Sequence, residues 1–137
     1  MIDIRKQLSV YLKNKPGELS RITKIFREND INIQAITVVD TVDHAVDRII
    51  VDKPDRAMEV LKNEGLLVVD HDVLAFDLKN RPGALSEIAD LLAEHEINLE
   101  YGYCTVEQDQ QHGLMVVKVS NPQEALELIQ STEAVER

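Results

Sequence analysis

The sequence has few of the features that mark several large protein classes. Its 137 residues include one cysteine, Cys104, and no tryptophan, and aromatic residues make up 4% of the chain. A single cysteine excludes an intrachain disulfide and a cysteine-based zinc cluster. No apolar run approaches the roughly 20 residues that a membrane-spanning helix needs. We therefore expect a cytoplasmic protein with no membrane partner.

Positive charge is also scarce. The chain has 15 Lys and Arg residues against 25 Asp and Glu residues, which gives a formal net charge of -10 at pH 7. Nucleic-acid binding needs an electropositive surface, because the protein must neutralise phosphates. This balance therefore argues against a nucleic-acid partner. Hydrophobic residues at 44% and charged residues at 29% are typical of a globular chain.

The sequence contains an internal repeat. The segment 14–20 (NKPGELS) recurs 66 residues later as the segment 80–86 (NRPGALS). At this offset, 12 of the 26 positions in residues 8–33 are identical to their counterparts. Ordinary composition would give roughly one or two identities by chance. The chain is therefore two copies of one unit, predicted to cover residues 1–69 and 70–137.

Periodicity predicts the same element order in both copies. In the first copy, alternating apolar residues indicate a strand at 8–12, and the spacing of Leu19, Ile22 and Phe26 indicates a helix. Pro54 suits the first turn of a second helix. The resulting order, β-α-β-β-α-β, is the ferredoxin-like pattern of an α+β fold. The expected strands are 8–12, 31–39, 46–51 and 66–69, followed in the second copy by 74–78, 97–106 and 114–119.

The second copy lacks an obvious last strand. The counterpart of residues 66–69 is a polar stub at residues 134–137, so we predict a short or missing strand there. Exposed sheet edges are usually protected. Either the N-terminal segment 1–4 or a partner chain could therefore complete this edge.

The sequence favours a protein without catalytic function. It has no glycine-rich phosphate loop, no nucleophile elbow and no zinc-binding histidine motif. His44, His71, His95 and His112 fall in four different predicted elements without ligand-like spacing, so we expect no metal and no cofactor. A helix-capping role explains His95. Cys104 is expected to be a small buried residue.

The loop that joins the first strand to the first helix is the most specific pattern. In both copies it reads Asn-(Lys/Arg)-Pro-Gly, starting at Asn14 and Asn80. Its glycine allows a ligand to approach the main chain, and the N–H groups of the following helix start attract a carboxylate. A second asparagine, Asn32 or Asn98, follows 18 residues later and offers both a donor and an acceptor. This combination suits a zwitterionic amino acid, although turn formation also explains such asparagines.

These motifs resemble the ACT domain, a small-molecule-binding regulatory module of many enzymes of amino-acid metabolism. The resemblance rests on residues 12–19 with 30–33, and on residues 78–85 with 96–99. It covers nearly the whole chain and is closest to free-standing proteins of two tandem ACT units. It implies two units side by side in one continuous eight-stranded antiparallel sheet, with the helices on one face. We also expect a homodimer.

The resemblance also implies where a ligand binds. In the family, the effector amino acid lies between two units, held by the strand-to-helix loop of one and the start of the second strand of the other. Some serine-binding members have a histidine where this chain has Leu12 and Leu78, which argues against serine. The residues carried over are Asn14, Gly17 and Leu19 facing Asn98, and Asn80, Gly83, Ala84 and Leu85 facing Asn32.

The two predicted sites differ in charge. Glu18 places a negative charge in the first helical turn, where a ligand carboxylate would lie, whereas Ala84 is neutral. A nearby like charge costs on the order of 1 kcal/mol, so we expect the second loop to bind more tightly. Tyr101 and Tyr103 add a difference, because small or aliphatic residues stand at these positions in the first copy. They line a side-chain pocket or pack in the core.

These observations leave several functions open. The first is a non-enzymatic sensor that binds a free amino acid and regulates a separate enzyme or regulator. The alternative is a structural adaptor without a small-molecule ligand, whose open strand edge binds a protein partner. A small hydrolase that uses Arg81 and an asparagine is disfavoured, because nothing else converges on Arg81. RNA-recognition modules need an aromatic, basic sheet, which this composition does not supply.

Overall fold

The computed structural model describes residues 2–105 and 110–136 and confirms the α+β fold with two βαββαβ units. Val106, the predicted end of one strand, and Met1 lie outside the described residues. The elements are β1 (Ile2–Lys13), α1 (Glu18–Glu28), β2 (Ile33–Asp40), β3 (His44–Val51), α2 (Pro54–Asn63), β4 (Leu67–Lys79), α3 (Ala84–Glu94), β5 (Leu99–Thr105), β6 (His112–Val119) and α4 (Pro122–Ile129).

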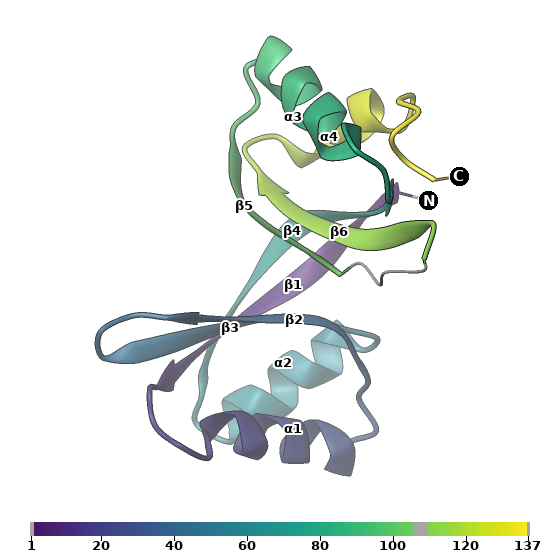
Figure 1. The fold of residues 1–137 in the computed structure, drawn as a ribbon. Helices are drawn as coiled ribbons and strands as arrows, with labels where there is room; N and C mark the ends of the chain where they lie inside the picture. Colours follow the sequence, from purple (N-terminus) through teal and green to yellow (C-terminus); the bar gives the residue numbers. More distant parts are fainter. Residues whose placement is uncertain (1, 106–109, 137) are drawn as a thin grey trace. The chain divides into compact units, whose positions relative to one another are not determined.

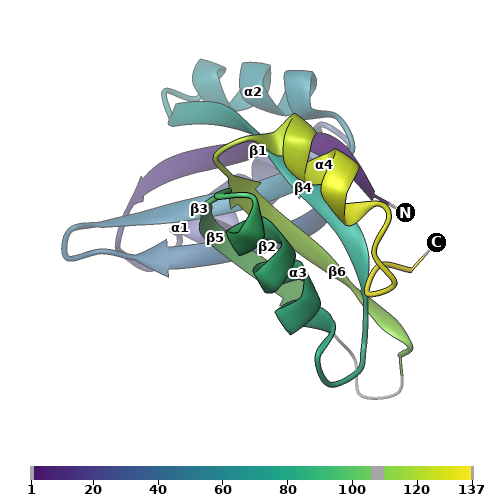
Figure 2. The same cartoon turned by 90° about the horizontal axis from the view of Figure 1, so that it is seen from above.

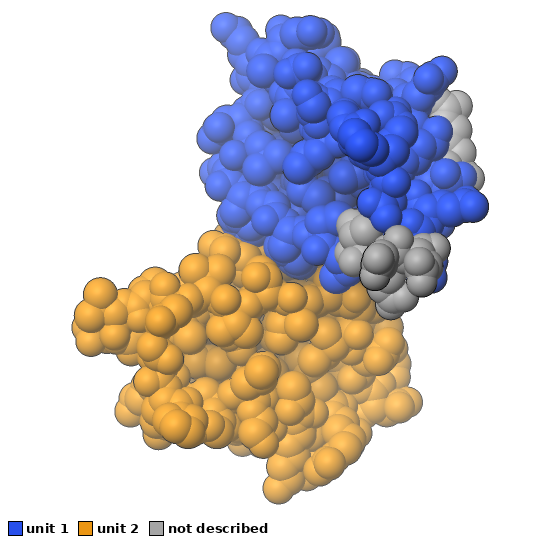
Figure 3. Space-filling model, viewed as in Figure 1, with its two compact units in different colours: residues 1–5, 72–137 blue, residues 6–71 orange. Residues whose placement is uncertain are grey.

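The chain divides into two compact units (Figure 3). The N-terminal unit is residues 6–71, and the C-terminal unit is residues 72–137 together with residues 1–5. The repeat boundaries expected from the sequence, 1–69 and 70–137, stay a prediction of where the two copies divide.

The core of the N-terminal unit lies between its strands and its two helices. Alternate residues of β1, including Leu8, are buried and face α1 and α2, which lie on the same side of the strands (Figure 1). Ile22 and Phe26 of α1 and Leu61 of α2 are buried against them, because each helix concentrates its apolar residues on one face. Within this unit the strand order is β2-β3-β1-β4.

The C-terminal unit repeats this arrangement. Leu74 and Phe76 of β4 are buried with Ile88 of α3 and Ile129 of α4. Both helices lie over the strands of this unit (Figure 2). The strand order here is β1-β4-β6-β5.

Strands β1 and β4 are longer than the sequence predicts. Strand β4 has 13 residues and joins the two predicted strands 66–69 and 74–78, whereas β1 extends back to Ile2. Each of them contributes residues to both units. Within the described residues the sheet has six strands, in the order β2-β3-β1-β4-β6-β5, and the expectation of eight strands is wrong.

The N-terminal segment completes the C-terminal unit. Residues 1–5 belong to that unit, and the side chains of Ile2 and Ile4 pack against its core. Strand β1 is the hydrogen-bonded neighbour of β4 in the sheet. Of the two predicted ways to fill the edge, the chain uses its own N-terminal segment.

A short C-terminal segment fills the rest of this edge. Val135 forms an isolated antiparallel bridge with Leu78. The N–H of Lys79 donates to the carbonyl oxygen of Ala134 at 2.8 Å, and Ala134 and Val135 are buried. The predicted short last strand is therefore confirmed as one bridge.

Candidate functional site

The first loop is a tight turn that begins α1. Its N–H at Lys15 donates to the carbonyl oxygen of Lys13 at 3.0 Å, and the chain then turns at Gly17 with φ 93°. This left-handed conformation favours glycine, because a Cβ atom would be strained there. Gly17 caps α1 without any side-chain hydrogen bond to the helix start. The first N–H groups of α1 therefore receive no side-chain acceptor from the capping residue.

The second loop has nearly the same backbone. The N–H of Arg81 donates to the carbonyl oxygen of Lys79 at 3.1 Å, and Gly83 has φ 87°. One difference is that the N–H of Ala84 already donates to the carbonyl oxygen of Arg81, at 3.2 Å. The side chain of Ala84 is buried in the core, so this residue can offer a ligand only its main chain. Leu85 is half-exposed, as is its counterpart Leu19.

Each loop asparagine is held by the neighbouring hairpin. The Nδ2 of Asn14 donates to Oδ1 of Asp40, and the Nδ2 of Asn80 donates to the carbonyl oxygen of Gln110 at 3.0 Å. Strand β3 explains the first contact, because it pairs on one side with the end of β1 and on the other with the end of β2. No local pattern indicates this contact, since Asp40 lies 26 residues from Asn14.

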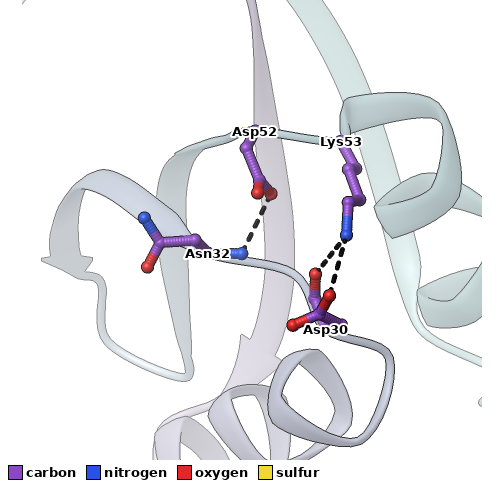
Figure 4. A network of polar contacts seen from close by, with 4 residues as sticks. All are labelled: Asp30, Asn32, Asp52 and Lys53. Atoms are coloured by element: carbon purple, nitrogen blue, oxygen red, sulfur yellow. Dashed lines mark hydrogen bonds and ion pairs between the residues drawn. The ribbon is translucent and has the colours of Figure 1, made fainter.

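Asn32 lies just before β2 in a fixed backbone (Figure 4). Its N–H donates to Oδ1 of Asp52 at 2.9 Å, and the N–H of Asp52 donates back to its carbonyl oxygen at 3.1 Å. Nζ of Lys53 also donates to the carbonyl oxygen of Asp30 at 2.6 Å, which stabilises the turn that precedes Asn32. The side chain of Asn32 points away from these groups (Figure 4) and makes no hydrogen bond within residues 2–105 and 110–136.

Asn98 has the same environment in the C-terminal unit. Its N–H donates to Oγ of Ser120 at 3.1 Å, and the N–H of Ser120 donates back to its carbonyl oxygen at 3.0 Å. Ser120 stands 68 residues after Asp52, so the repeat itself could have identified this supporting pair. Asn32 and Asn98, which directly precede β2 and β5, are both exposed.

The charge of Glu18 is partly balanced. Its side chain is 16% exposed, and its Oε1 lies 3.6 Å from Nζ of Lys15. In the second loop, Arg81 pairs with Glu87 instead, at 2.9 Å. The predicted difference in affinity between the two loops stays a prediction.

A buried carboxylate that the sequence analysis did not identify lies in β3. Asp47 is 1% exposed and stands opposite Val10 of β1 and Val38 of β2. Its Oδ2 has no hydrogen-bond partner among the described residues. Burial raises the pKa of this carboxyl above its ordinary value, because desolvation disfavours the charged form. The corresponding residue of the second copy, 68 positions later, is the buried Met115.

Two smaller predictions have opposite outcomes. The cap at His95 is confirmed, because its Nδ1 forms a hydrogen bond with the carbonyl oxygen of Leu91 at 3.0 Å, just as Asn29 caps the end of α1.

The expectation that Cys104 is buried is wrong, since it lies exposed on the outer strand β5. Partial desolvation nevertheless raises the pKa of its thiol. Strand β5 also carries Tyr101 and Tyr103, whose role in a pocket stays a prediction.

The predicted pairings each join a loop of one unit to an asparagine of the other, and they stay predictions. Within residues 2–105 and 110–136, no three His, Cys, Asp or Glu side chains are grouped to hold a metal ion. Among the same residues, no helix combines the length and apolar character needed to cross a membrane.

Comparisons with known proteins agree with this architecture. A family model described as an ACT domain pair matches residues 3–135. The crystal structure of protein BT0572 from Bacteroides thetaiotaomicron is 29% identical, with a TM-score of 0.89, and the match covers 98% of this chain and 92% of that one. No curated protein matches the sequence significantly.

Two further solved structures share the fold. The regulatory subunit of aspartate kinase from Thermus thermophilus, in its ligand-free form, has a TM-score of 0.70 at 13% identity, with 95% of each chain covered. The regulatory subunit of aspartate kinase from Thermus flavus has a TM-score of 0.63 at 14% identity, covering 93% of this chain and 90% of that one. The family match over residues 3–135 shows that the chain belongs to the ACT domain pair family.

Proposed function

We propose that the chain is a non-enzymatic sensor, which binds a free amino acid and regulates a separate enzyme or regulator of amino-acid metabolism. The observation that carries this proposal is that Asn32 and Asn98 are exposed on a fixed backbone. The backbones of Asn32 and Asn98 are fixed by reciprocal hydrogen bonds, whereas their side chains are exposed. Fixed main chain with a free amide is suited to ligand recognition, because little entropy is lost on binding.

The two loops supply the complementary half of each proposed site. The N–H groups at the helix starts after Gly17 and Gly83 suit an α-carboxylate, because they carry the positive end of the helix dipole. The Oδ1 atoms of Asn32 and Asn98 suit an ammonium group as hydrogen-bond acceptors. The proposed binding residues are Asn14, Gly17 and Leu19 with Asn98, and Asn80, Gly83, Ala84 and Leu85 with Asn32.

A regulatory role is supported by the shared fold with regulatory subunits of aspartate kinase. Regulation requires the ligand to favour one arrangement of the units over another. A homodimer and a separate partner enzyme belong to this proposal. The adaptor alternative depended on an open strand edge, which residues 2–5 and the bridge at Val135 occupy.

The first experiment is a melting-temperature scan with each of the twenty amino acids. A ligand present at about 100 times its dissociation constant stabilises by about 2.7 kcal/mol. This should raise the melting temperature by several degrees for a chain of this size. One chemical class of amino acid is expected to give the rise, and no rise with any amino acid would contradict the proposal.

Variants then assign the response to the asparagines. Asn32→Ala and Asn98→Ala are each expected to reduce the stabilisation by the amino acid, and the double variant should abolish it. Asn63→Ala, at the exposed end of α2, is the matched control and should leave the response unchanged. A calorimetric titration adds the stoichiometry: the charge of Glu18 predicts two unequal sites, and equal sites would contradict that difference.

A further inference from the structure

A separate hollow of about 420 Å³ lies beside the first loop of the N-terminal unit. Its walls come from the end of β1, the start of α1, His44 and the turn between α2 and β4. All of the residues that line it belong to residues 6–71. Asn14, Gly17, Leu19 and Asn32 are not among them, and the hollow borders the proposed amino-acid site only at Glu18.

The charge of this hollow is opposite to that of the whole chain. Lys13, Lys15 and Arg21 line it, whereas Glu18 is its one acidic lining residue. Glu18 is paired with Lys15 at 3.6 Å. The guanidinium of Arg21 donates to the carbonyl oxygen of Glu64 at 3.0 Å, and no described residue forms an ion pair with Lys13. Lys13 and Arg21 therefore have no acidic partner within the described part of a protein whose net charge is -10.

The same hollow also has apolar walls. Leu67 is 63% exposed, and Tyr11 is one of the other exposed large hydrophobic residues of the described chain. Both line the hollow, together with Leu12 and Leu66. Binding pockets typically combine apolar walls with a few polar groups that fix the orientation of the ligand. The walls and the charges together suit an anion with an apolar body.

The second copy keeps Lys79 at the position of Lys13 but has replaced Arg21 and Tyr11. Glu87 stands where the first copy has Arg21, and it neutralises Arg81 at 2.9 Å. Asp77 replaces Tyr11 and lies 3.7 Å from Nδ1 of His112. The corresponding surface of the C-terminal unit is therefore unsuited to an anion. The cationic, apolar hollow is a property of the first copy.

We propose that the hollow beside the first loop binds a small organic carboxylate that has an apolar body and no amino group. Lys13 and Arg21 hold the carboxylate, and Tyr11 and Leu67 contact the apolar body. An amino group would meet Glu18 only in competition with Lys15, whose Nζ lies 3.6 Å from Oε1 of Glu18. This site goes beyond the proposed amino-acid sensor and does not depend on it.

The test uses 4-methyl-2-oxopentanoate as the probe in a calorimetric titration of the full chain. Leucine has the same carbon skeleton with an ammonium group, and inorganic phosphate is an anion without an apolar body. We expect saturable binding of the oxo acid at one site per chain, at least about tenfold tighter than phosphate or leucine at that site. No saturable binding, or equal binding of phosphate, would overturn the proposal.

Charge variants on α1 locate the site. Arg21→Glu introduces the residue of the second copy and should weaken binding of the probe by about tenfold or more. Lys24→Glu makes the same charge change on the same helix outside the hollow and should change the affinity by less than about twofold. Equal weakening by both variants would overturn the assignment. Arg21→Gln, a milder change, keeps the test valid if Arg21→Glu unfolds.

Binding of the probe is also separable from the amino-acid site. Asn32→Ala should leave the affinity for 4-methyl-2-oxopentanoate unchanged, because Asn32 does not line the hollow. Loss of probe binding in this variant would overturn the proposal. If the chain binds the oxo acid but no amino acid, the carboxylate site in the hollow is supported and the proposed sensor function is contradicted.

Discussion

The two units keep the same backbone turns and differ in the side chains around them. Gly17 and Gly83 have φ 93° and 87°, and Asp30 and Glu96, at the ends of the first helices, both have φ 55°. Both copies keep these backbone conformations because the chain needs a left-handed residue just before and just after α1 and α3. The side chains at equivalent positions have changed charge, as the replacement of Asp47 by Met115 shows. Turn residues therefore preserve the fold, whereas charged residues distinguish the two units.

The units also differ in how their last strand is built. The N-terminal unit takes residues 67–71 of β4, which follow its own α2, whereas the C-terminal unit takes residues 2–5 from the opposite end of the chain. The C-terminal unit therefore depends on a segment that the repeat does not contain. This dependence predicts that the two units respond differently to changes at the N-terminus.

Removal of residues 1–5 is expected to have the largest effect on stability. It exposes part of the β4 edge and removes the packing of Ile2 and Ile4, and we expect the C-terminal unit to lose about 3 kcal/mol or more. Hydrogen exchange should show faster exchange along residues 72–79 than along β3. Asp3→Asn is the control, because its pair with Arg5 is partly exposed and worth less than about 1 kcal/mol. Equal loss of protection in both units would contradict this difference between them.

The sequence predicted most of the fold because turn signals separate its periodic segments. Pro16-Gly17 and Pro82-Gly83 mark the helix starts in both copies, and the structure confirms those helices. The continuous strand β4 was missed because polar residues 70–72 interrupt the apolar pattern between its two halves. The extension of β1 was missed because its pairing with β4 is a contact between distant parts of the chain, and local periodicity carries no signal for it.

The site was less predictable than the fold. The glycine turns follow from residue type, since left-handed backbone favours glycine at Gly17 and Gly83. The support of Asn32 by Asp52 was missed, because it depends on two segments that meet only after β2 and β3 have paired. Burial of Asp47 was missed for a different reason. Strand alternation places Asp47 on the same face as Ile49, but an acidic residue is ordinarily expected to face solvent.

Asp47→Asn is the next largest expected change and tests the difference between Asp47 and Met115. Burying an ionised carboxylate without a partner costs more than burying the neutral amide that replaces it, so Asp47→Asn should stabilise the N-terminal unit by about 1–2 kcal/mol at neutral pH. Chemical denaturation measures this change. Asp43→Asn, exposed at the β2–β3 turn, is the matched control and should change stability by less than about 0.5 kcal/mol. Destabilisation by Asp47→Asn would show that the carboxylate has a stabilising partner.

The pH dependence of the same variant gives the sign of the effect. Because burial raises the pKa of Asp47 in the folded state, the folded protein binds this proton more tightly than the unfolded chain. Below the ordinary aspartate pKa of about 3.9 the carboxyl is neutral in both states, and its ionisation costs nothing. As pH rises from there to the raised pKa, the wild type loses stability relative to Asp47→Asn, and the difference is constant above it. A difference that shrinks as pH rises would contradict this account.

The smallest expected change tests whether the two loops are equivalent. Gly17→Ala and Gly83→Ala each place a Cβ atom on a left-handed residue, which costs about 1 kcal/mol. An added Cβ would meet nothing within 4 Å at Gly17 and one Arg81 nitrogen at 3.9 Å at Gly83, so backbone strain is the main cost and should be equal in both loops. Thermal denaturation of the two variants should therefore give equal losses. Ser20→Ala and Ser86→Ala, at equivalent positions just after each turn, are the controls and should cost less than about 0.5 kcal/mol. Unequal losses at the two glycines would mean that the loops differ in backbone energy as well as in charge. The shared left-handed turn would then not be an equal contribution to the fold of both copies.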